Sequence, residues 1–191
     1  LPMLSQFFTN FSYMGAGFVL APLFLDEVFG YSVTKASYLI SSRPLFFALA
    51  GPVVSIIGIR LGERVLAVTG AALVMSSALG LAVGAAGTSD LFIFAALGVA
   101  GFGLGSSMPA MTSAITHAVA EDDIATAGGA QQMMWQLGTA AGIEVLGSVQ
   151  ESREKVVPLA DSFGQAFLVA AGFAAVGMVL AFGVTRLKHD D

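Results

Sequence analysis

The segment that decides the fold runs from residue 91 to residue 116 and reads LFIFAALGVAGFGLGSSMPAMTSAIT. It contains no charged side chain over its whole length. An α-helix rises about 1.5 Å per residue, so a segment this long can cross a hydrocarbon layer about 30 Å thick. The segment therefore predicts a helix that spans a membrane.

Five further segments of the same kind surround it. The predicted spans cover residues 3–25, 36–58, 66–86, 91–116, 126–149 and 163–185, with short polar breaks between them. The composition agrees, because 56% of the 191 residues are hydrophobic and only 11% are charged, whereas soluble proteins carry about 25% charged residues. The sequence predicts an all-α integral membrane fold, a single six-helix domain over residues 1–191 with both chain ends on one side.

Several other classes of protein are excluded by composition. The chain has no cysteine, which leaves no disulfide framework and no thiol chemistry. Its net charge of −5 comes from acids scattered through the polar breaks, and no basic run suggests a nucleic-acid partner. No metal or cofactor is expected. The glycines at 101, 103 and 105 are not a nucleotide-binding fingerprint, because no strand precedes them. The start at Leu1-Pro2, without a signal-peptide pattern, favours a piece of a longer protein.

Glycine and proline are concentrated in the fourth predicted helix. Gly101 and Gly105 are four residues apart, and Pro109 follows four residues later, so the three lie on one face. Small residues at this spacing let another helix approach closely. Plain helix packing is the first interpretation, and a helix that bends during a functional cycle is the second.

The first predicted helix carries a polar stripe. Gln6, Asn10, Tyr13 and Gly17 fall within about 60° of one another at 100° per residue. Amide and phenol groups facing lipid would leave hydrogen-bond donors without partners, so the stripe must face protein or a water-filled cavity. It predicts either hydrogen bonds between helices or the lining of a binding cavity.

The fifth predicted helix repeats this pattern. Gln132, Trp135, Gln136 and Thr139 share one face of about 100°. Amide and indole groups beside the flexible Met133 and Met134 suit bulky, partly apolar ligands. Trp135 could instead anchor the helix at the membrane boundary. Gln6, Asn10, Tyr13, Gln132, Trp135 and Gln136 are therefore the candidate substrate contacts.

Two ionisable residues lie inside the apolar spans, Arg43 in the second and Glu144 in the fifth. A charge in hydrocarbon costs roughly 2.5–3.5 kcal/mol even on the most lenient scale, so it persists with a partner or a water-lined path. The helical rise puts the two residues at about 12 Å and 8 Å from the same side, which makes a pair possible. The pair is interpreted as a buried salt bridge, or as a proton-binding carboxylate tuned by Arg43.

An enzyme is not predicted. Ser106 and His117 suggest an intramembrane serine protease at first sight. A nucleophile and its base must lie within hydrogen-bond reach, and one straight helix cannot provide that contact across eleven residues.

The sequence also resembles a known family. The similarity is carried by LDEVFGYS at 25–32, RP at 43–44, GIRLGER at 58–64, GFGLG at 101–105 with Pro109, Gly128-Gly129 and QLGTAAG at 136–142. These stretches resemble the C-terminal half of a major facilitator superfamily transporter, in its fourteen-helix drug:proton antiporter branch. The resemblance covers essentially the whole chain.

The resemblance implies a specific architecture. The six helices would form two inverted three-helix repeats, half of a major facilitator fold, which dock against an N-terminal six-helix half. The family's cytoplasmic loop between its second and third helices is matched by Gly58, Arg60, Gly62 and Arg64, a gate motif with the expected positive-inside bias. The acidic residue usual before its basic pair is absent here. Glu144 stands where the branch ordinarily has a small apolar residue, so its role rests on the residue alone.

The function expected from the sequence is secondary active transport by alternating access in the plasma membrane. Proton-coupled export of amphipathic small molecules fits best, with the lipid bilayer, the other half of the protein, substrate and protons as partners. An uptake permease for a metabolite and a receptor or binding module that moves no cargo are the alternatives.

Overall fold

The computed structural model describes residues 1–183, apart from the side chains of residues 55 and 57–60. The helical elements are α1 (Pro2–Met14), the π-helix η1 (Gly15–Leu20), α2 (Ala21–Glu27), α3 (Val33–Ile40), α4 (Ser42–Leu61), α5 (Glu63–Gly84), α6 (Asp90–Thr116), the 3-10 turn η2 (Glu121–Asp123), α7 (Ile124–Glu154) and α8 (Leu159–Ala181). The described residues contain no strand. The all-α prediction is confirmed.

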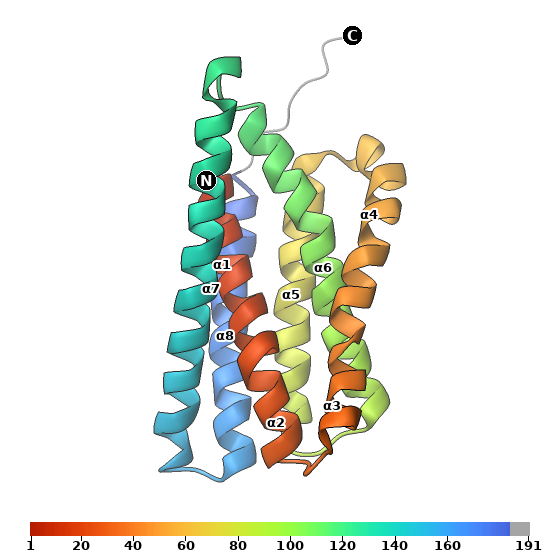
Figure 1. Cartoon of the computed structure of the whole chain (residues 1–191), viewed down its shortest axis with the longest axis vertical. Helices are drawn as coiled ribbons and strands as arrows, with labels where there is room; N and C mark the ends of the chain where they lie inside the picture. The colour runs from red at the N-terminus through yellow and green to blue at the C-terminus, as the bar shows by residue number, and fades with distance from the viewer. Residues whose placement is uncertain (184–191) are drawn as a thin grey trace.

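These elements form long rods that run along one axis (Figure 1). The first rod is continuous from α1 through η1 to α2, and the second consists of α3 and α4 with Ser41 between them. Among the described residues, five rods are long and apolar enough to cross a membrane: 2–27, 33–54, 63–84, 90–116 and 159–181. The exception is α7, the longest helix.

Helix ends differ from the predicted ranges where polar residues join the first or last turn. The second rod begins at Val33 because the Ser32 side chain accepts a hydrogen bond from the Lys35 backbone N–H. The end of α7 extends to Glu154, since the Gln150 amide donates to Ser162 Oγ of α8 at 3.4 Å. Polar side chains thus lengthen helices that hydropathy alone would end.

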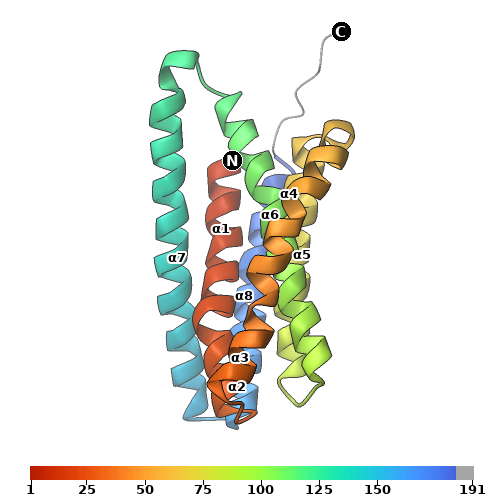
Figure 2. The same ribbon diagram turned by 45° about the vertical axis from the view of Figure 1, so that its right-hand side comes forward.

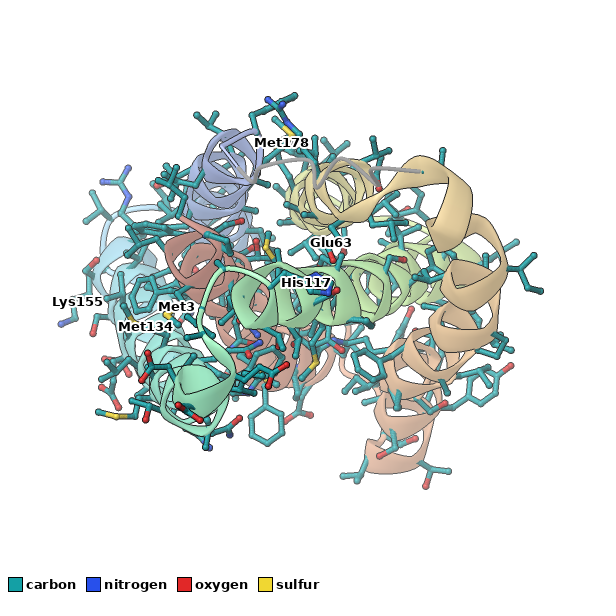
Figure 3. All side chains as sticks on the ribbon, turned by 90° about the horizontal axis from the view of Figure 1, so that it is seen from above. Met3, Glu63, His117, Met134, Lys155 and Met178 are labelled. Carbon is teal, nitrogen blue, oxygen red and sulfur yellow. The ribbon has the colours of Figure 1, made fainter. Side chains whose placement is uncertain are left out.

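The rods are arranged in two layers (Figures 1 and 2). α5 and α8 pack against each other, α1 packs against α7 and α8, and α6 packs against α4 and α5. Seen along the axis in Figure 3, α4 and α7 lie on the two flanks. A Cβ added to Gly183 would lie 2.6 Å from Leu1 Cδ1, so the first and last described residues meet at one end.

Glycines mediate the close contacts between rods. A Cβ on Gly142 of α7 would lie 2.2 Å from the Phe11 carbonyl oxygen of α1. A Cβ on Gly101 of α6 would lie 2.1 Å from the Arg43 carbonyl oxygen of α4, and Gly105 packs similarly one turn along. The predicted small-residue strip of α6 therefore lies against α4. Pro109 lies further along α6, which continues to Thr116.

The aromatic core lies where α2 meets α8. Phe24, Phe163 and Phe167 are fully buried, with ring centroids 5.5–5.7 Å apart for the pairs that Phe24 makes. These rings join the first rod to the last, so the bundle is closed at the end that contains α2.

The contact between α1 and α7 leads to a stability prediction. Gly142→Ala should destabilise the purified protein by about 1–3 kcal/mol, because the new Cβ overlaps the Phe11 carbonyl. Gly147→Ala, on the same helix, is the matched control, since no atom lies within 4 Å of its added Cβ. Thermal unfolding in detergent measures both. Equal melting temperatures for the two variants would contradict the close packing.

Candidate functional site

Arg43 lies deep inside the bundle. Only 6% of it is exposed, and its Nη2 donates a hydrogen bond to the Tyr13 carbonyl oxygen at 2.7 Å. Its Cζ lies 4.0 Å from the centre of the Tyr13 ring, a cation–π contact. Tyr13 is eleven residues from the start of α1, about 16 Å along the helix. The guanidinium is therefore held near the middle of the first rod.

The backbone of the first rod makes room for this side chain. A Cβ on Gly17 would lie 2.3 Å from Arg43 Cζ, so a larger residue there would displace the guanidinium. Gly17 also belongs to the π-helical segment η1, which begins two residues after Tyr13. Single π-helical turns within α-helices are rare and frequently occur at functional sites. The sequence pattern showed the stripe but gave no sign of this widened turn.

Arg43 and Glu144 do not form an ion pair. Within the part of the chain that the structure describes, no carboxylate lies within 4.0 Å of the guanidinium. Glu144 is exposed and lines a shallow open pocket with Val145 and Ser148. It follows Gly142 by two residues, about 200° around the helix, and Gly142 faces α1. Similar depth in the membrane was therefore not enough to bring Arg43 and Glu144 together, because Glu144 lies on the face of α7 that points away from α1.

The polar stripe of α1 bonds to α7. Asn10 is fully buried, and its Nδ2 donates to the Trp135 carbonyl oxygen at 2.8 Å and to Thr139 Oγ1 at 2.7 Å. Gln6 and Tyr13 are 4% and 8% exposed. Asn10 forms the hydrogen bonds between helices that one interpretation of this stripe predicts. In this conformation Gln6, Asn10 and Tyr13 are all closed to a ligand.

The candidate residues of α7 remain accessible. Gln132 and Gln136 are exposed and Trp135 is half-buried. The hydrogen bond from Asn10 puts Trp135 level with a residue about 12 Å along α1. This depth favours a position inside the hydrocarbon over an anchor at its boundary.

A second α7 contact was not predicted. Gln131 is 9% exposed, and its Nε2 donates to Thr112 Oγ1 of α6 at 2.7 Å. Gln131 precedes Gly138 by seven residues and therefore shares the helix face that packs on α1. The seven-residue spacing was the signal available in the sequence. The hydrogen bond ties α7 to α6, and the same face of α7 packs on α1.

The predicted gate motif lies between α4 and α5. Gly62 has φ of +78°, a left-handed conformation that suits glycine at this turn. Arg64 Cζ lies 6.0 Å from the centre of the Phe182 ring. The side chains of Gly58 and Arg60 lie outside the described residues.

Glu63, which lies between Gly62 and Arg64 of the gate motif, contacts two residues of α6. Glu63 accepts a hydrogen bond from Ser113 Oγ, and its Oε1 lies 3.2 Å from His117 Nδ1. Figure 3 labels Glu63 and His117. This cluster ties the start of α5 to the end of α6. Sequence reasoning missed it because its members lie fifty residues apart. Ser106 bonds to the Phe102 carbonyl instead, so it does not meet His117.

The opposite end of the bundle has a matching tie. Lys35 Nζ lies 2.7 Å from Asp90 Oδ2 and 3.5 Å from the centre of the Tyr31 ring. The Tyr31 hydroxyl donates to the Asp90 carboxylate, and this hydrogen bond, with burial, raises the pKa of Tyr31 above its usual range. The cluster connects the start of α3 to the start of α6.

Comparison with known proteins identifies the family. The Major Facilitator Superfamily model matches residues 3–190 of the chain. The chain belongs to this superfamily. Together with the apolar rods, this membership indicates a multi-pass membrane protein.

Two curated proteins are similar to the chain in sequence. Each is a methyl viologen resistance protein, SmvA, from Salmonella typhimurium strains 14028s and LT2, and each is 29% identical to the chain over 151 residues. The match covers 79% of this chain and 29% of each relative. It therefore spans under a third of the length of these relatives.

Solved structures of two transporters share the fold. A POT family transporter with a thioalcohol-conjugated peptide aligns with a TM-score of 0.79 at 19% identity, covering 98% of this chain and 38% of that one. The inward-open xylose transporter XylE from E. coli aligns at 0.76 and 15% identity, covering 96% and 48%. Membership of the Major Facilitator Superfamily, a family of transporters, confirms the prediction that the chain is not an enzyme.

The bond between α1 and α7 can be tested by a double-mutant cycle. Asn10→Ala and Thr139→Val should each destabilise the protein, and their combination should cost less than the sum. We expect a coupling energy of about 0.6–1.7 kcal/mol, the range found for hydrogen bonds between membrane helices. Unfolding in a denaturing detergent measures it. Strict additivity would show that the two side chains do not interact.

Proposed function

We propose that this chain is the C-terminal six-helix half of a proton-coupled exporter of amphipathic small molecules. It would act in the plasma membrane by alternating access, docked against an N-terminal six-helix half of the same protein. The partial coverage of the longer relatives supports the proposal that a second half exists. The resemblance of the motifs supports the fourteen-helix drug:proton antiporter branch.

Helix packing supports two inverted three-helix repeats. In the first half of the chain the rods are α1–α2, α3–α4 and α5, and in the second half they are α6, α7 and α8. If the two sets of rods are matched in order, α1–α2 corresponds to α6, α3–α4 to α7, and α5 to α8. The α1 contacts with α7 and α8 then correspond to the α6 contacts with α4 and α5. Both sets of contacts are present, as a pseudo-two-fold relation between repeats requires.

The observation that carries the proposal is the exposed polar face of α7. Gln132, Gln136, Glu144 and Ser148 are all exposed on this helix, where they alternate with the exposed apolar residues Met133, Leu137 and Val145. Beyond Asp161 in its first turn, the exposed positions on α8 carry no polar side chain, as at Leu168, Val176 and Val179. Polar side chains at membrane depth face protein or water, because lipid offers no hydrogen-bond partner. We infer that α7 borders a water-filled path beside the second half, whereas α8 faces lipid.

The same face supplies the proposed substrate contacts. Gln132, Trp135 and Gln136 are accessible at a depth suited to a central site. The indole face can bind a flat, partly apolar cation through a cation–π contact, and the oxygens of the two amides can lie against its positive charge. The resistance described for the two relatives concerns methyl viologen, a flat aromatic dication, and this agreement supports the assignment.

The remaining candidates on α1 would contact substrate in another state. Gln6, Asn10 and Tyr13 are buried within the bundle. For Asn10 to reach a ligand, its bonds to Trp135 and Thr139 must break and α1 must separate from α7. Gly101, Gly105 and Pro109 are proposed as the positions where α6 slides or bends against α4.

Glu144 is the proposed coupling residue. It is exposed on α7 and has no ion partner among the described residues, so its carboxylate is open to bind either a proton or a cationic substrate, one in place of the other. Arg43, which points into the bundle, is left as a structural cation. The end with Gly62 and Arg64 is proposed as the cytoplasmic gate, where the Glu63–His117 contact would hold α5 to α6.

The substrate contacts can be tested in proteoliposomes that contain the full-length protein. Trp135→Ala and Gln136→Ala should raise KM for methyl viologen about tenfold, the effect of losing roughly 1.4 kcal/mol of binding. Leu137→Ala is the control, because this neighbour is 55% exposed but offers neither aromatic nor polar contact. Equal KM values for all three variants would refute the site.

Proton coupling is tested in the same vesicles with an internal pH dye. Glu144→Gln should abolish substrate-dependent proton flux while binding persists, because glutamine keeps the shape and loses the titratable proton. Glu151→Gln, exposed further along α7, should leave flux unchanged. Normal flux in Glu144→Gln would assign coupling to another carboxylate. No flux with any compound in the unmodified protein would favour an uptake permease or a binding module.

A further inference from the structure

A groove between α5 and α8 opens on the outside of the bundle. It lies where α5 ends and α8 begins, at the end of the bundle that contains α2 (Figure 1), and its volume is about 260 Å³. Its floor is closely packed, since a Cβ on Gly164 of α8 would lie 3.4 Å from the Ala82 carbonyl oxygen of α5. None of the proposed substrate contacts lines this groove.

The groove is polar at one end and apolar at the other. Asp161 and Gln165 line it one turn apart near the start of α8, so they share one face of that helix. Leu168 lies seven residues beyond Asp161, about 10 Å further along the axis, and is 53% exposed. The headgroup layer on each side of a bilayer is about 5–8 Å thick, so this length extends from headgroup to acyl chain. The other lining residues are Ala82, Val83, Ala85, Ala86 and Gly164.

The surroundings of the groove are those of a lipid-facing surface. Both α5 and α8 are long and apolar enough to cross a membrane. Exposed apolar side chains continue from the groove along each rod, as at Leu79 on α5 and Val176 on α8. Bilayer lipid is therefore the molecule that covers the groove, and the charges at its polar end decide which headgroup fits.

Two charges of opposite sign flank the polar end. The exposed Asp161 carboxylate has no Lys, Arg or His nitrogen within 4.0 Å among the described residues. Arg153, in the last turn of α7, donates from Nε to Gln165 Oε1. Gln165 thus lies between an acid that can only accept hydrogen bonds and a guanidinium that can only donate them. A headgroup that carries both a donating cation and an accepting anion complements this arrangement.

We propose that the groove binds a phospholipid with a primary ammonium headgroup, phosphatidylethanolamine. The ammonium donates to the Asp161 carboxylate, the phosphate accepts from Arg153, and an acyl chain lies along Leu168. Phosphatidylcholine has no N–H to donate to Asp161. The site rests on the lipid-facing position proposed for α8, and it depends on neither the substrate nor proton coupling.

Native mass spectrometry tests the site in the full-length protein, delipidated in detergent and titrated with either lipid at identical acyl chains. The first phosphatidylethanolamine should bind about fivefold more tightly than the first phosphatidylcholine, the upper range for an exposed ion pair. In Asp161→Asn the two lipids should bind equally, because the amide keeps the shape of the side chain and loses its charge. Arg153→Gln should weaken both lipids and keep the preference, since both carry the phosphate.

The matched control is Asp122→Asn. Asp122 is also an exposed acid, but it belongs to η2 at the opposite end of the bundle, so its variant should keep the preference. Ala86→Phe places a bulky ring in the groove without changing any charge and should remove the preference, which decides the matter if Asp161→Asn does not fold.

Equal binding of the two lipids by the unmodified protein would overturn the proposal. A preference that survives Asp161→Asn or Ala86→Phe would overturn it as well, because the ammonium would then be recognised elsewhere. Lipid binding is measured without substrate or a proton gradient, so a failure of the proposed transport activity leaves this result unaffected.

Discussion

Close approach of helix backbones at glycines is the constraint on which this structure depends. In hydrocarbon, no hydrophobic effect drives helices together, so they associate through close van der Waals packing and interhelical hydrogen bonds. Gly142 against Phe11 and Gly101 against Arg43 bring backbone within contact distance of backbone. These contacts hold both flanking helices: α7 against α1, and α4 against α6.

The polar interior follows from that packing. Once α1 and α7 are in contact, Asn10 can reach both a carbonyl and a hydroxyl of its neighbour. Once α4 is in contact with α6, the Arg43 side chain is directed across the bundle to the π-helical segment, where Gly17 leaves space for it. The bundle thus buries the Arg43 side chain and most of the polar groups of α1. Several polar side chains of α7 remain accessible.

Much of this fold is predictable from the sequence, because long apolar runs and glycine spacing are local properties. The run at 91–116 predicts α6, and the strip with Gly101 predicts its close contact. The rotation of each helix about its own axis, which decides the face it turns to its neighbours, is not a local property of the sequence. Arg43 and Glu144 have similar depths, but only the packing of Gly142 shows that Glu144 faces away from α1. The Glu63–His117 tie and the π-helical segment left no pattern in the sequence, since each depends on partners from distant segments.

In the proposed transporter, α7 borders water at membrane depth, whereas α8 faces lipid. Because this chain has no cysteine, single cysteines at Gln132, Gln136, Leu168 and Val176 can report on each face. Reaction with a membrane-impermeant maleimide in vesicles should modify Gln132→Cys and Gln136→Cys rapidly and leave Leu168→Cys and Val176→Cys unmodified. Equal protection at all four positions would contradict the account, because both helices would then face the same surroundings.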